Sequence, residues 1–280
     1  MELPITAQGL ITACTSPRVC RVESFLTDTE CAVLIAAAYP RLQPAYAGLQ
    51  AGEGRTSQGC ELPCELPAAA SVLRKVRGLV RLPFERMEEV YVSRYSRGQR
   101  YDTHHDAPDE SDPDAERFLA SGGGQRVATV LVYLNTVASG GQTTFPLAGL
   151  AVAPRRGAPH HLMRAAVRVP RPALTRRCSA LRTGMALVFF PATLDGRRDD
   201  MALHGAMPAD DTKWVAQVWI RQRRAADPLL HSLRSALDSC PDLDDPLQYR
   251  RGGCSCRAAD RRVHGGADTA RVWTYRPCGD

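Results

Sequence analysis

Long hydrophobic runs are absent from this chain of 280 residues. Two of its most apolar segments, "CAVLIAAAY" and "VATVLVYL", have the length of buried core elements and not of a membrane-spanning helix. The beginning, "MELPITAQGLITACTSP", has no basic start followed by a long apolar stretch, so we expect no secretory signal in it. These absences predict no membrane span, but they assign no compartment. The endoplasmic reticulum lumen would suit a trimmed secretory-pathway chain, and the cytoplasm would suit any other.

Lysine is nearly absent. Of the 36 basic residues all but Lys75 and Lys213 are arginine, and the net charge is +6. The arginines are scattered, with clusters only near 155–182, 221–224 and 250–262, and they are not interleaved with aromatic residues as in a face that binds single strands. We therefore expect no nucleic-acid partner, although a basic surface that attracts acidic partners stays open.

Paired CxxC motifs are missing as well. Among the ten cysteines, neither Cys60 with Cys64 nor Cys254 with Cys256 has the spacing of a structural zinc site. Their density is far below that of a disulfide scaffold, and the sequence assigns no disulfide pairing. With 44% apolar and 24% charged residues, the chain has the composition of an ordinary soluble globular protein with a sizeable core.

Two helices are expected in the first third of the chain. Thr27 and Glu30 have the spacing of a capping box, and the apolar run behind them predicts a helix that ends near Pro40, with a strand before it. The segment "AAASVLRKVRGLVRL" has apolar residues at helical spacing, which predicts a second helix with one buried side. Residues 50–65, rich in glycine and cysteine, are expected to form a loop between them. The buried side of the second helix would consist of Val72, Leu73, Val76, Leu79 and Val80.

Farther along, the apolar pattern changes to that of strands. "EEVYVSRY" alternates like a half-buried strand, and "QRVATVLVYLNTV", "GMALVFFP" and "KWVAQVWIRQ" are further strands. Helices followed by short strands predict an α+β fold with a closed or sandwich-like β core. Residues 148–178, rich in proline and arginine, are expected to be a surface insertion. Residues 225–280 are expected to form one helix, beginning at Asp227, and a loosely structured tail.

The stretch "YDTHHDAP" suggests a metal site. On extended backbone His104 and Asp106 share a face, and His105 between them points the other way. An imidazole and a carboxylate on one face are two arms of the 2-His-1-carboxylate site that non-haem Fe(II) oxygenases use. A polar surface turn is the alternative, because these two residues alone specify little.

A third ligand has to come from elsewhere in the chain. His160 and His161 lie in the expected insertion, His231 lies in the late helix, and His264 lies in the tail. Only His204 is flanked by predicted core strands on both sides, which makes it the best candidate.

Lys213 lies nine residues after His204, at the start of an apolar strand. A dicarboxylate that chelates iron needs a cation for its far carboxylate, because an unpaired buried charge is costly. A compact ammonium in a chain that otherwise uses arginine suggests that specific role. An ordinary lysine at a strand end is the alternative.

Four longer motifs follow one another along the chain: "VSRYSRGQRYDTHHD", "VLVYLNTVASGGQTTFP", "GMALVFF" and "HGAMPADDTKWVAQVWI". Before them stand "RVESFLTDTEC" and "GRTSQG". Together they resemble the catalytic domain of prolyl 4-hydroxylases, in the Fe(II)/2-oxoglutarate dioxygenase superfamily. The likeness runs from about Arg18 to Arg221. It suggests a lead over residues 1–17, a dioxygenase domain over 18–224 with the insertion inside it, and a separate part over 225–280.

This resemblance implies a double-stranded β-helix, or jelly roll, with supporting N-terminal helices. It implies an enzyme that hydroxylates the 4-position of prolyl residues in a peptide or protein, using O2 and converting 2-oxoglutarate to succinate and CO2. Ascorbate would restore iron that has become oxidised. The implied residues are His104, Asp106 and His204 for Fe(II), Lys213, Tyr95 and Thr143 for 2-oxoglutarate, and Tyr101 and Trp219 as walls of the proline pocket.

Some features depart from the family pattern. The spacing from His204 to Lys213 is one residue shorter than usual, so the turn after Pro208 should be tighter. The insertion is longer than usual, and the part after Arg224 has no counterpart. Two other interpretations stay open. One is a dioxygenase of the same superfamily that acts on free proline, another small molecule or a non-prolyl residue. The other is a non-catalytic binding module, which the intact set of site residues disfavours.

Overall fold

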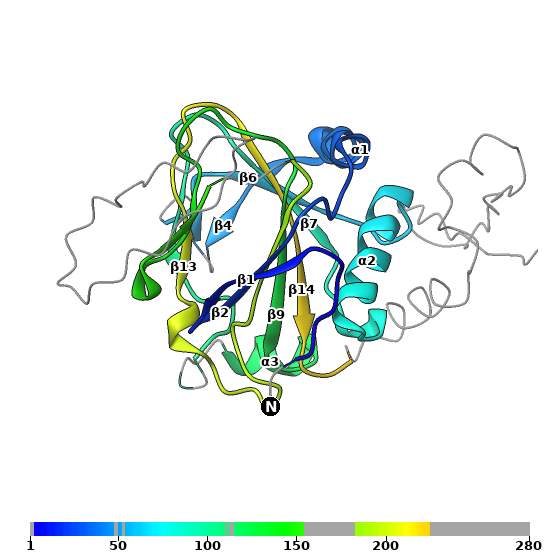
Figure 1. Cartoon of the computed structure of the whole chain (residues 1–280), viewed down its shortest axis with the longest axis vertical. Helices are drawn as coiled ribbons and strands as arrows, with labels where there is room; N and C mark the ends of the chain where they lie inside the picture. The colour runs from blue at the N-terminus through cyan, green and yellow to red at the C-terminus, as the bar shows by residue number, and fades with distance from the viewer. Residues whose placement is uncertain are drawn as a thin grey trace, which may run out of the picture. The chain divides into compact units, whose positions relative to one another are not determined.

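Two antiparallel sheets form the centre of the fold (Figure 1). The computed structural model describes residues 3–47, 50–51, 54–109, 111, 115–153 and 183–224, and all that follows concerns these residues. The chain divides into two units, 1–239 and 240–280, and the second lies outside the described residues. The major sheet has eight strands in the order β1-β2-β12-β9-β14-β7-β6-β3. They are β1 (Leu10–Thr15), β2 (Arg18–Val22), β12 (Ala186–Phe189), β9 (Arg126–Tyr133), β14 (Lys213–Arg221), β7 (Val90–Tyr95), β6 (Gln58–Leu62) and β3 (Gln43–Pro44).

The minor sheet has four short strands in the order β11-β10-β13-β8. They are β11 (Leu150–Val152), β10 (Thr143–Phe145), β13 (His204–Ala206) and β8 (Tyr101–His104), and a separate pair joins β4 (Tyr46–Ala47) to β5 (Gln50–Ala51). The helices are α1 (Asp28–Ala38), α2 (Pro67–Val80) and α3 (Ala115–Gly122), with 3-10 turns η1 (Tyr39–Arg41), η2 (Phe84–Arg86), η3 (Pro146–Ala148) and η4 (Asp200–Ala202). This α+β arrangement of two antiparallel sheets confirms the predicted jelly roll. None of the described helices is long and apolar enough to cross a membrane.

Both predicted helices are present. At the start of α1 the Thr27 hydroxyl accepts from the Glu30 backbone N–H at 3.2 Å, and the Glu30 carboxylate accepts from the Thr27 N–H at 2.8 Å. This reciprocal capping box satisfies two backbone donors that a helix start otherwise leaves free. In α2 the five apolar residues that share one side are all at most 2% exposed. The predicted helical periodicity of α2 is therefore confirmed.

The four predicted strands are confirmed as β7, β9, β12 and β14. The loop expected over residues 50–65 is wrong at Gln58–Leu62, which form β6 and pair with β7. A methyl group at Gly59 would lie 2.2 Å from the Tyr91 hydroxyl oxygen, so the glycine that suggested a loop instead makes room for an aromatic ring of the next strand. Residues 10–15, expected to lie in a lead, form the edge strand β1 of the major sheet. Leu150–Val152, expected to begin the insertion, pair with β10.

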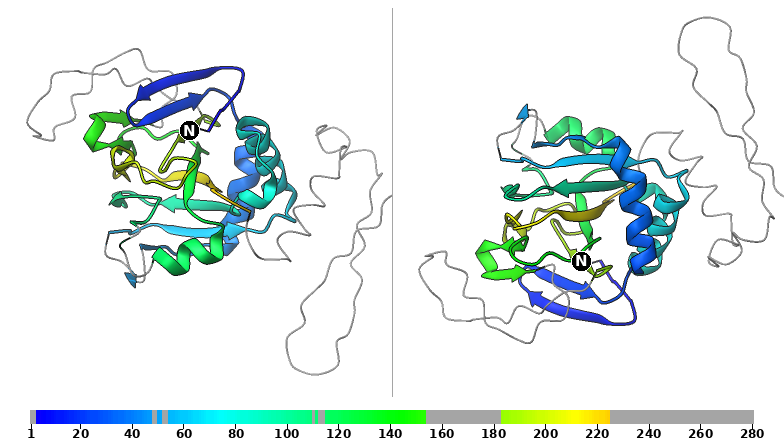
Figure 2. Two further views of the ribbon diagram at one scale, coloured as in Figure 1. Left: turned by 90° about the horizontal axis from the view of Figure 1, so that it is seen from below. Right: turned by 90° about the horizontal axis from the view of Figure 1, so that it is seen from above.

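Two buried clusters lie on opposite faces of the major sheet. On one face, apolar residues of α1 and α2 pack against Val92, Val130 and Val218. On the other face, turned toward the minor sheet, Leu131, Tyr133 and other residues pack with Phe145 and Leu150. Figure 2 shows α1 and α2, in blue and cyan, together on one side of the strands. The inner cluster between the sheets is where the predicted site residues gather.

Several expectations lie outside the described residues. These are the insertion from residue 154 to 178, the helix and tail after residue 224, and the histidines His160, His161, His231 and His264. The predicted domain limits stay a prediction.

Candidate metal and co-substrate site

The two sheet strands β8 and β13 bring the predicted metal ligands together. His104 ends β8, His204 begins β13, and the two residues are direct partners across this strand pair. Asp106 follows two residues after β8, and one ligand atom from each of the three side chains lies within 4.8 Å of the others. The Nε2 atoms of His104 and His204 lie 3.6 Å and 3.7 Å from the two oxygens of Asp106.

Backbone carbonyls fix the proton on each imidazole. His104 Nδ1 lies 2.9 Å from the Asp102 carbonyl oxygen, and His204 Nδ1 lies 3.0 Å from that of Ala202. A carbonyl only accepts, so each Nδ1 carries the hydrogen and each Nε2 presents its lone pair to Asp106. His204 Nε2 is buried and has no hydrogen-bond partner among the described residues. An orphaned lone pair facing a carboxylate fits a cation between them.

The protonation states suit the same role. Burial lowers the pKa of His204 to about 4. Burial alone would raise the pKa of Asp106, but His204 and His104 outweigh it and hold that pKa well below its ordinary value. Thr129 on β9 donates its hydroxyl to Asp106 Oδ2 at 2.6 Å. At neutral pH the cluster therefore holds a carboxylate and neutral imidazole, the states in which these groups bind metal.

Aromatic rings enclose the cluster. The Tyr101 ring stacks on His104 with centroids 3.7 Å apart. Phe189 and Phe145 lie against His204, with centroids at 4.5 Å and 5.7 Å. Both phenylalanines belong to the inner buried cluster that also contains Tyr95 and Tyr133 (two tyrosines of the major sheet). The predicted metal and 2-oxoglutarate residues thus share one interior.

Lys213 stands in this interior without a counter-charge. It is 1% exposed and pairs with Tyr95 across β14 and β7. Its Nζ lies 5.0 Å from the Tyr95 ring centre and 5.8 Å from that of Tyr133, and in the described part of the chain no carboxylate lies within 4.0 Å of it. Burial lowers the pKa of Lys213 to about 7. A buried ammonium among phenol rings is arranged to receive an anion.

Thr143 is linked to the surroundings of Lys213 by Tyr133, whose ring lies near the lysine and whose hydroxyl contacts Thr143. The Tyr133 hydroxyl donates to Thr143 Oγ1 at 2.7 Å, and both residues are at most 2% exposed. Neither Tyr133 nor Thr129 was predicted as a site residue. A signal for both exists in the sequence, since they are polar residues at even spacing on the otherwise apolar strand "VATVLVY".

Trp219 and His105 lie at the edges of the site. Trp219 stands opposite Thr129 in the strand register, with the Arg126 guanidinium 3.9 Å from its ring centre. His105 lies outside the ligand cluster. Burial and then the charge of Arg198 lower the pKa of His105.

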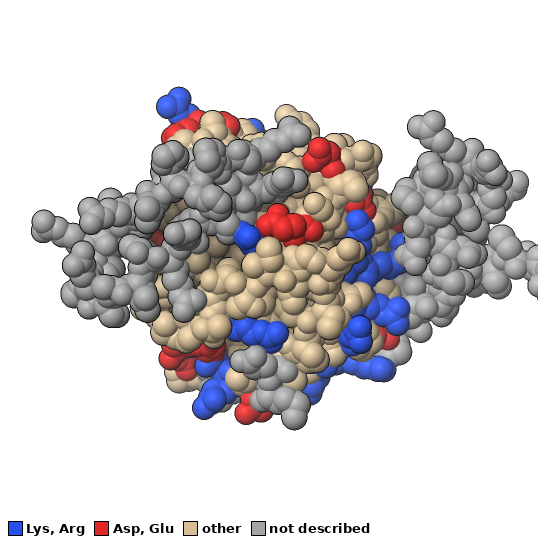
Figure 3. Space-filling view, in the orientation of Figure 1, with Lys and Arg blue, Asp and Glu red and all other residues tan. Residues whose placement is uncertain are grey.

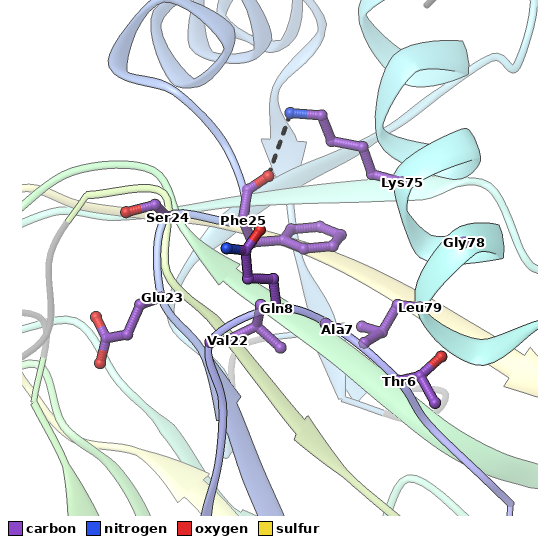
Figure 4. A pocket seen from close by; sticks show the side chains of 11 residues that line it. Thr6, Ala7, Gln8, Val22, Glu23, Ser24, Phe25, Lys75, Gly78 and Leu79 are labelled. Atoms are coloured by element: carbon purple, nitrogen blue, oxygen red, sulfur yellow. Dashed lines mark hydrogen bonds between the residues drawn. The ribbon is translucent and has the colours of Figure 1, made fainter.

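A separate hollow of about 540 Å³ lies between residues 6–9, the turn at 22–25 and α2 (Figure 4). Lys75 reaches over it and donates to the Phe25 carbonyl oxygen at 3.2 Å. None of the eight predicted site residues lines this hollow. In the face drawn in Figure 3, Lys and Arg side chains gather along the α2 side, and α2 itself carries Arg74, Lys75 and Arg77. These basic residues belong to the helix side of the major sheet, whereas the site lies on the other side.

Comparisons with known proteins agree with this geometry. A sequence profile of the 2OG-Fe(II) oxygenase superfamily matches residues 90–221. Prolyl 4-hydroxylase 1 of Arabidopsis thaliana is 33% identical over 219 residues, which are 74% of this chain and 70% of the relative. Prolyl 4-hydroxylase 2 of the same plant is 33% identical over 261 residues, which are 83% of this chain and 75% of the relative.

A solved structure shares the fold. The crystal structure of a viral collagen prolyl hydroxylase from Paramecium Bursaria Chlorella virus-1 aligns with a TM-score of 0.50 at 24% identity, over 80% of this chain and 98% of that one. The matched profile spans β7 to β14 and so contains His104, Asp106, His204 and Lys213. The chain belongs to the prolyl 4-hydroxylase-like family of 2OG-Fe(II) oxygenases, oxidoreductases that use Fe(II) and 2-oxoglutarate.

Proposed function

We propose that this enzyme hydroxylates prolyl residues of a peptide or protein at the 4-position. The observation that carries the proposal is the presence, in one interior, of a His-Asp-His cluster with an ionised carboxylate and of a buried lysine without a carboxylate partner among the described residues. The relatives named prolyl 4-hydroxylases support the substrate class.

His104, Asp106 and His204 would hold the iron through their two Nε2 atoms and the Asp106 carboxylate. Their hydrogen bonds to Asp102, Ala202 and Thr129 keep these donor atoms turned toward one another. Three ligands on one side leave the other side free for 2-oxoglutarate and O2. When bound there, the iron supplies the activation of O2 that the protein's own groups cannot provide.

Lys213 would pair with the distal carboxylate of 2-oxoglutarate. Its Nζ needs an anion to offset its burial, and the described residues offer none. Tyr95 and Thr143 are the neighbouring polar groups and would contact the same co-substrate. Because Thr143 Oγ1 already accepts from Tyr133, its own hydroxyl hydrogen is left to donate to an anion.

Tyr101 and Trp219 would form walls of the pocket for the target proline. Tyr101 is stacked on His104 and so lies directly beside the metal cluster. A proline ring is apolar and rigid, and aromatic faces suit it. In the overall reaction one oxygen atom of O2 enters the prolyl C4–H bond. The other oxidises 2-oxoglutarate to succinate with release of CO2.

The test is hydroxylation of a proline-containing peptide library, read by mass spectrometry, with Fe(II), 2-oxoglutarate and ascorbate. Free proline at the same concentration serves as the competing substrate, and His204→Ala serves as the inactive control. We expect a mass gain of one oxygen on peptidyl proline, with an equal amount of succinate, from the unaltered enzyme only. Oxidation of free proline in place of peptide would overturn the substrate class, and unchanged turnover by His204→Ala would remove His204 from the metal site.

A further inference from the structure

Asn135 is the only asparagine in the chain, and it follows β9 by two residues. Its Nδ2 donates to the Thr212 carbonyl oxygen at 2.7 Å, and its Oδ1 accepts from the Trp214 backbone N–H at 2.7 Å. One side chain thus reaches across to β14 and makes two short hydrogen bonds there.

These two bonds hold the peptide groups on either side of Lys213. The Thr212 carbonyl belongs to the peptide bond before Lys213, and the Trp214 N–H belongs to the peptide bond after it. Holding both planes fixes the backbone dihedral angles of Lys213, and therefore the direction in which its side chain leaves the strand. Trp214 packs in the helix-side cluster, so Lys213 is turned to the inner face, beside Tyr95 and Tyr133.

The segment between β9 and β10, which contains Asn135, also contacts the short turn that precedes Lys213. Met207 N–H donates to the Gln142 carbonyl at 2.8 Å, and Gly141 N–H donates to that of Pro208 at 2.7 Å. A methyl group on Gly140 would lie 2.3 Å from the Pro208 carbonyl oxygen, so the approach requires glycine. The hydrogen bonds of Asn135 continue these contacts to the point where the turn ends and β14 begins.

The chemistry of the two bonds selects an amide. An aspartate of the same shape would accept from Trp214 but would place a carboxylate oxygen against the Thr212 carbonyl oxygen. Alanine would make neither bond. The asparagine amide donates through Nδ2 and accepts through Oδ1 from one small planar group, as these two bonds require.

We propose that Asn135 is the positioning residue for Lys213 and thereby sets the affinity for 2-oxoglutarate. The inference rests on the role of Lys213 proposed above. The Asn135 amide is already engaged by Thr212 and Trp214, so its proposed role is indirect. It acts by keeping the lysine side chain directed into the interior before the co-substrate binds, so that binding does not have to order it.

The experiment measures 2-oxoglutarate binding directly, by calorimetry on enzyme loaded with Mn(II), and the KM for 2-oxoglutarate and kcat with Fe(II). Asn135→Ala and Asn135→Asp are compared with Asp211→Ala. That control removes another hydrogen bond between the same two segments, from the Ala138 N–H to Asp211 Oδ2 at 3.2 Å, and leaves the peptide groups around Lys213 untouched. We expect both Asn135 variants to bind 2-oxoglutarate roughly tenfold more weakly, with a matching rise in KM, an unchanged Mn(II) affinity and little change for Asp211→Ala.

A double-mutant cycle with Lys213→Ala separates positioning from general loosening of the fold. If Asn135 acts through the lysine, Asn135→Ala weakens 2-oxoglutarate binding no further in the Lys213→Ala background. In the Asn135→Ala variant the Trp214 amide, which has lost its hydrogen bond to Asn135, should also exchange its hydrogen faster. Equal additional loss in both backgrounds, or loss of Mn(II) affinity along with 2-oxoglutarate, would overturn the inference. If Lys213→Ala itself binds 2-oxoglutarate normally, the proposed role of Lys213 fails first, which is a distinguishable result.

Discussion

The two ends of the candidate site are built in opposite ways. At the metal end, on the minor sheet, His104 and His204 face the carboxylate of Asp106, and each polar group has a counterpart within 4 Å. At the other end, on the major sheet, the ammonium of Lys213 lies among the rings of Tyr95 and Tyr133 with no carboxylate within salt-bridge distance among the described residues.

This difference tells which partner each end needs. The metal end gathers lone pairs and one negative charge, so a cation completes it. At the lysine end the buried ammonium of Lys213 costs stability, so an anion completes this end. A chelating dicarboxylate such as 2-oxoglutarate would satisfy both ends at once, if one carboxylate binds the metal and the other pairs with Lys213 as proposed above. The comparison therefore predicts that removing charge from one end harms the protein differently from removing it at the other.

The largest effect is expected from Asp106→Asn. The substitution keeps the size of the side chain and its contact with Thr129 but removes the negative charge that two imidazoles face. Iron affinity should fall by more than about 100-fold, because loss of a residue that only hydrogen-bonds to a metal ligand already lowers metal affinity by roughly 10–100-fold. Equilibrium dialysis with Fe(II) under anaerobic conditions measures it, and turnover should vanish in parallel. Iron retention near the level of the unaltered protein would show that Asp106 is not a ligand.

Lys213→Met should weaken 2-oxoglutarate binding at the other end of the site and at the same time stabilise the protein without ligand. The variant should bind 2-oxoglutarate on the order of 100-fold more weakly, because an anion would lose its buried counter-charge. The protein without ligand should become roughly 1–4 kcal/mol more stable near neutral pH, because a flexible apolar chain replaces a buried charge. Calorimetry with 2-oxoglutarate and chemical denaturation measure the two effects. Lys75→Met is the matched control, since Lys75 is partly exposed and paired with Glu30, and it should leave 2-oxoglutarate binding unchanged.

The sign of the pH dependence sharpens this prediction. Burial lowers the pKa of Lys213 from 10.5 to about 7 in the folded protein, so between these values the unfolded chain holds more protons. Stability of the unaltered protein should therefore rise with pH over that window, and the advantage of Lys213→Met should shrink as pH increases from about 7 to 10. The affinity for 2-oxoglutarate should change the other way and weaken above about pH 7. A stability difference that stays constant from pH 7 to 10 would contradict the buried, titrating lysine.

Local sequence signals predicted some elements of the fold and missed others. The capping box of α1, the apolar side of α2 and the alternating strands are local patterns, and they specified their elements. The strand β6 was missed because its glycine and cysteine residues suggest a loop, and its identity depends on Tyr91 of a strand some 30 residues away. Long-range pairing is not visible in a window of sequence.

The residues around the ligands show the same limit. Histidine and aspartate two residues apart, with a rare lysine farther on, suggest their chemistry from type and spacing. The even spacing of Thr129 and Tyr133 on an apolar strand marks them only as polar residues of one face, because their partners Asp106 and Thr143 lie on other elements. Asn135 has no such spacing signal. Asn135 contacts β14 almost 80 residues later, and its place in "LVYLNTV" gives no sign of that contact.

Thr129→Val should produce a moderate effect at the metal end. Valine matches threonine in shape but cannot donate to Asp106 Oδ2, which then loses a 2.6 Å hydrogen bond in a buried place. Iron affinity should fall by roughly tenfold, as expected for a group that orients a ligand. Thr129→Ser restores the hydroxyl and should recover most of the loss. If the serine variant binds iron as poorly as the valine variant, packing of the methyl group and not the hydrogen bond is what matters.

The smallest effect is expected from His105→Ala, and it is informative because His105 is the neighbour of a ligand. The strand alternation that turns His104 toward Asp106 turns His105 away, and the structure places His105 outside the ligand cluster. Its Nδ1 is buried without a hydrogen-bond partner among the described residues, so truncation removes no satisfied polar contact there. Iron content measured by elemental analysis should match that of the unaltered protein, with a stability change below about 1 kcal/mol. His104→Ala, prepared in parallel, should lose most of its iron. Equal loss in the two variants would mean that the register of the chain through residues 104–106 is wrong, and with it the assignment of the whole metal end.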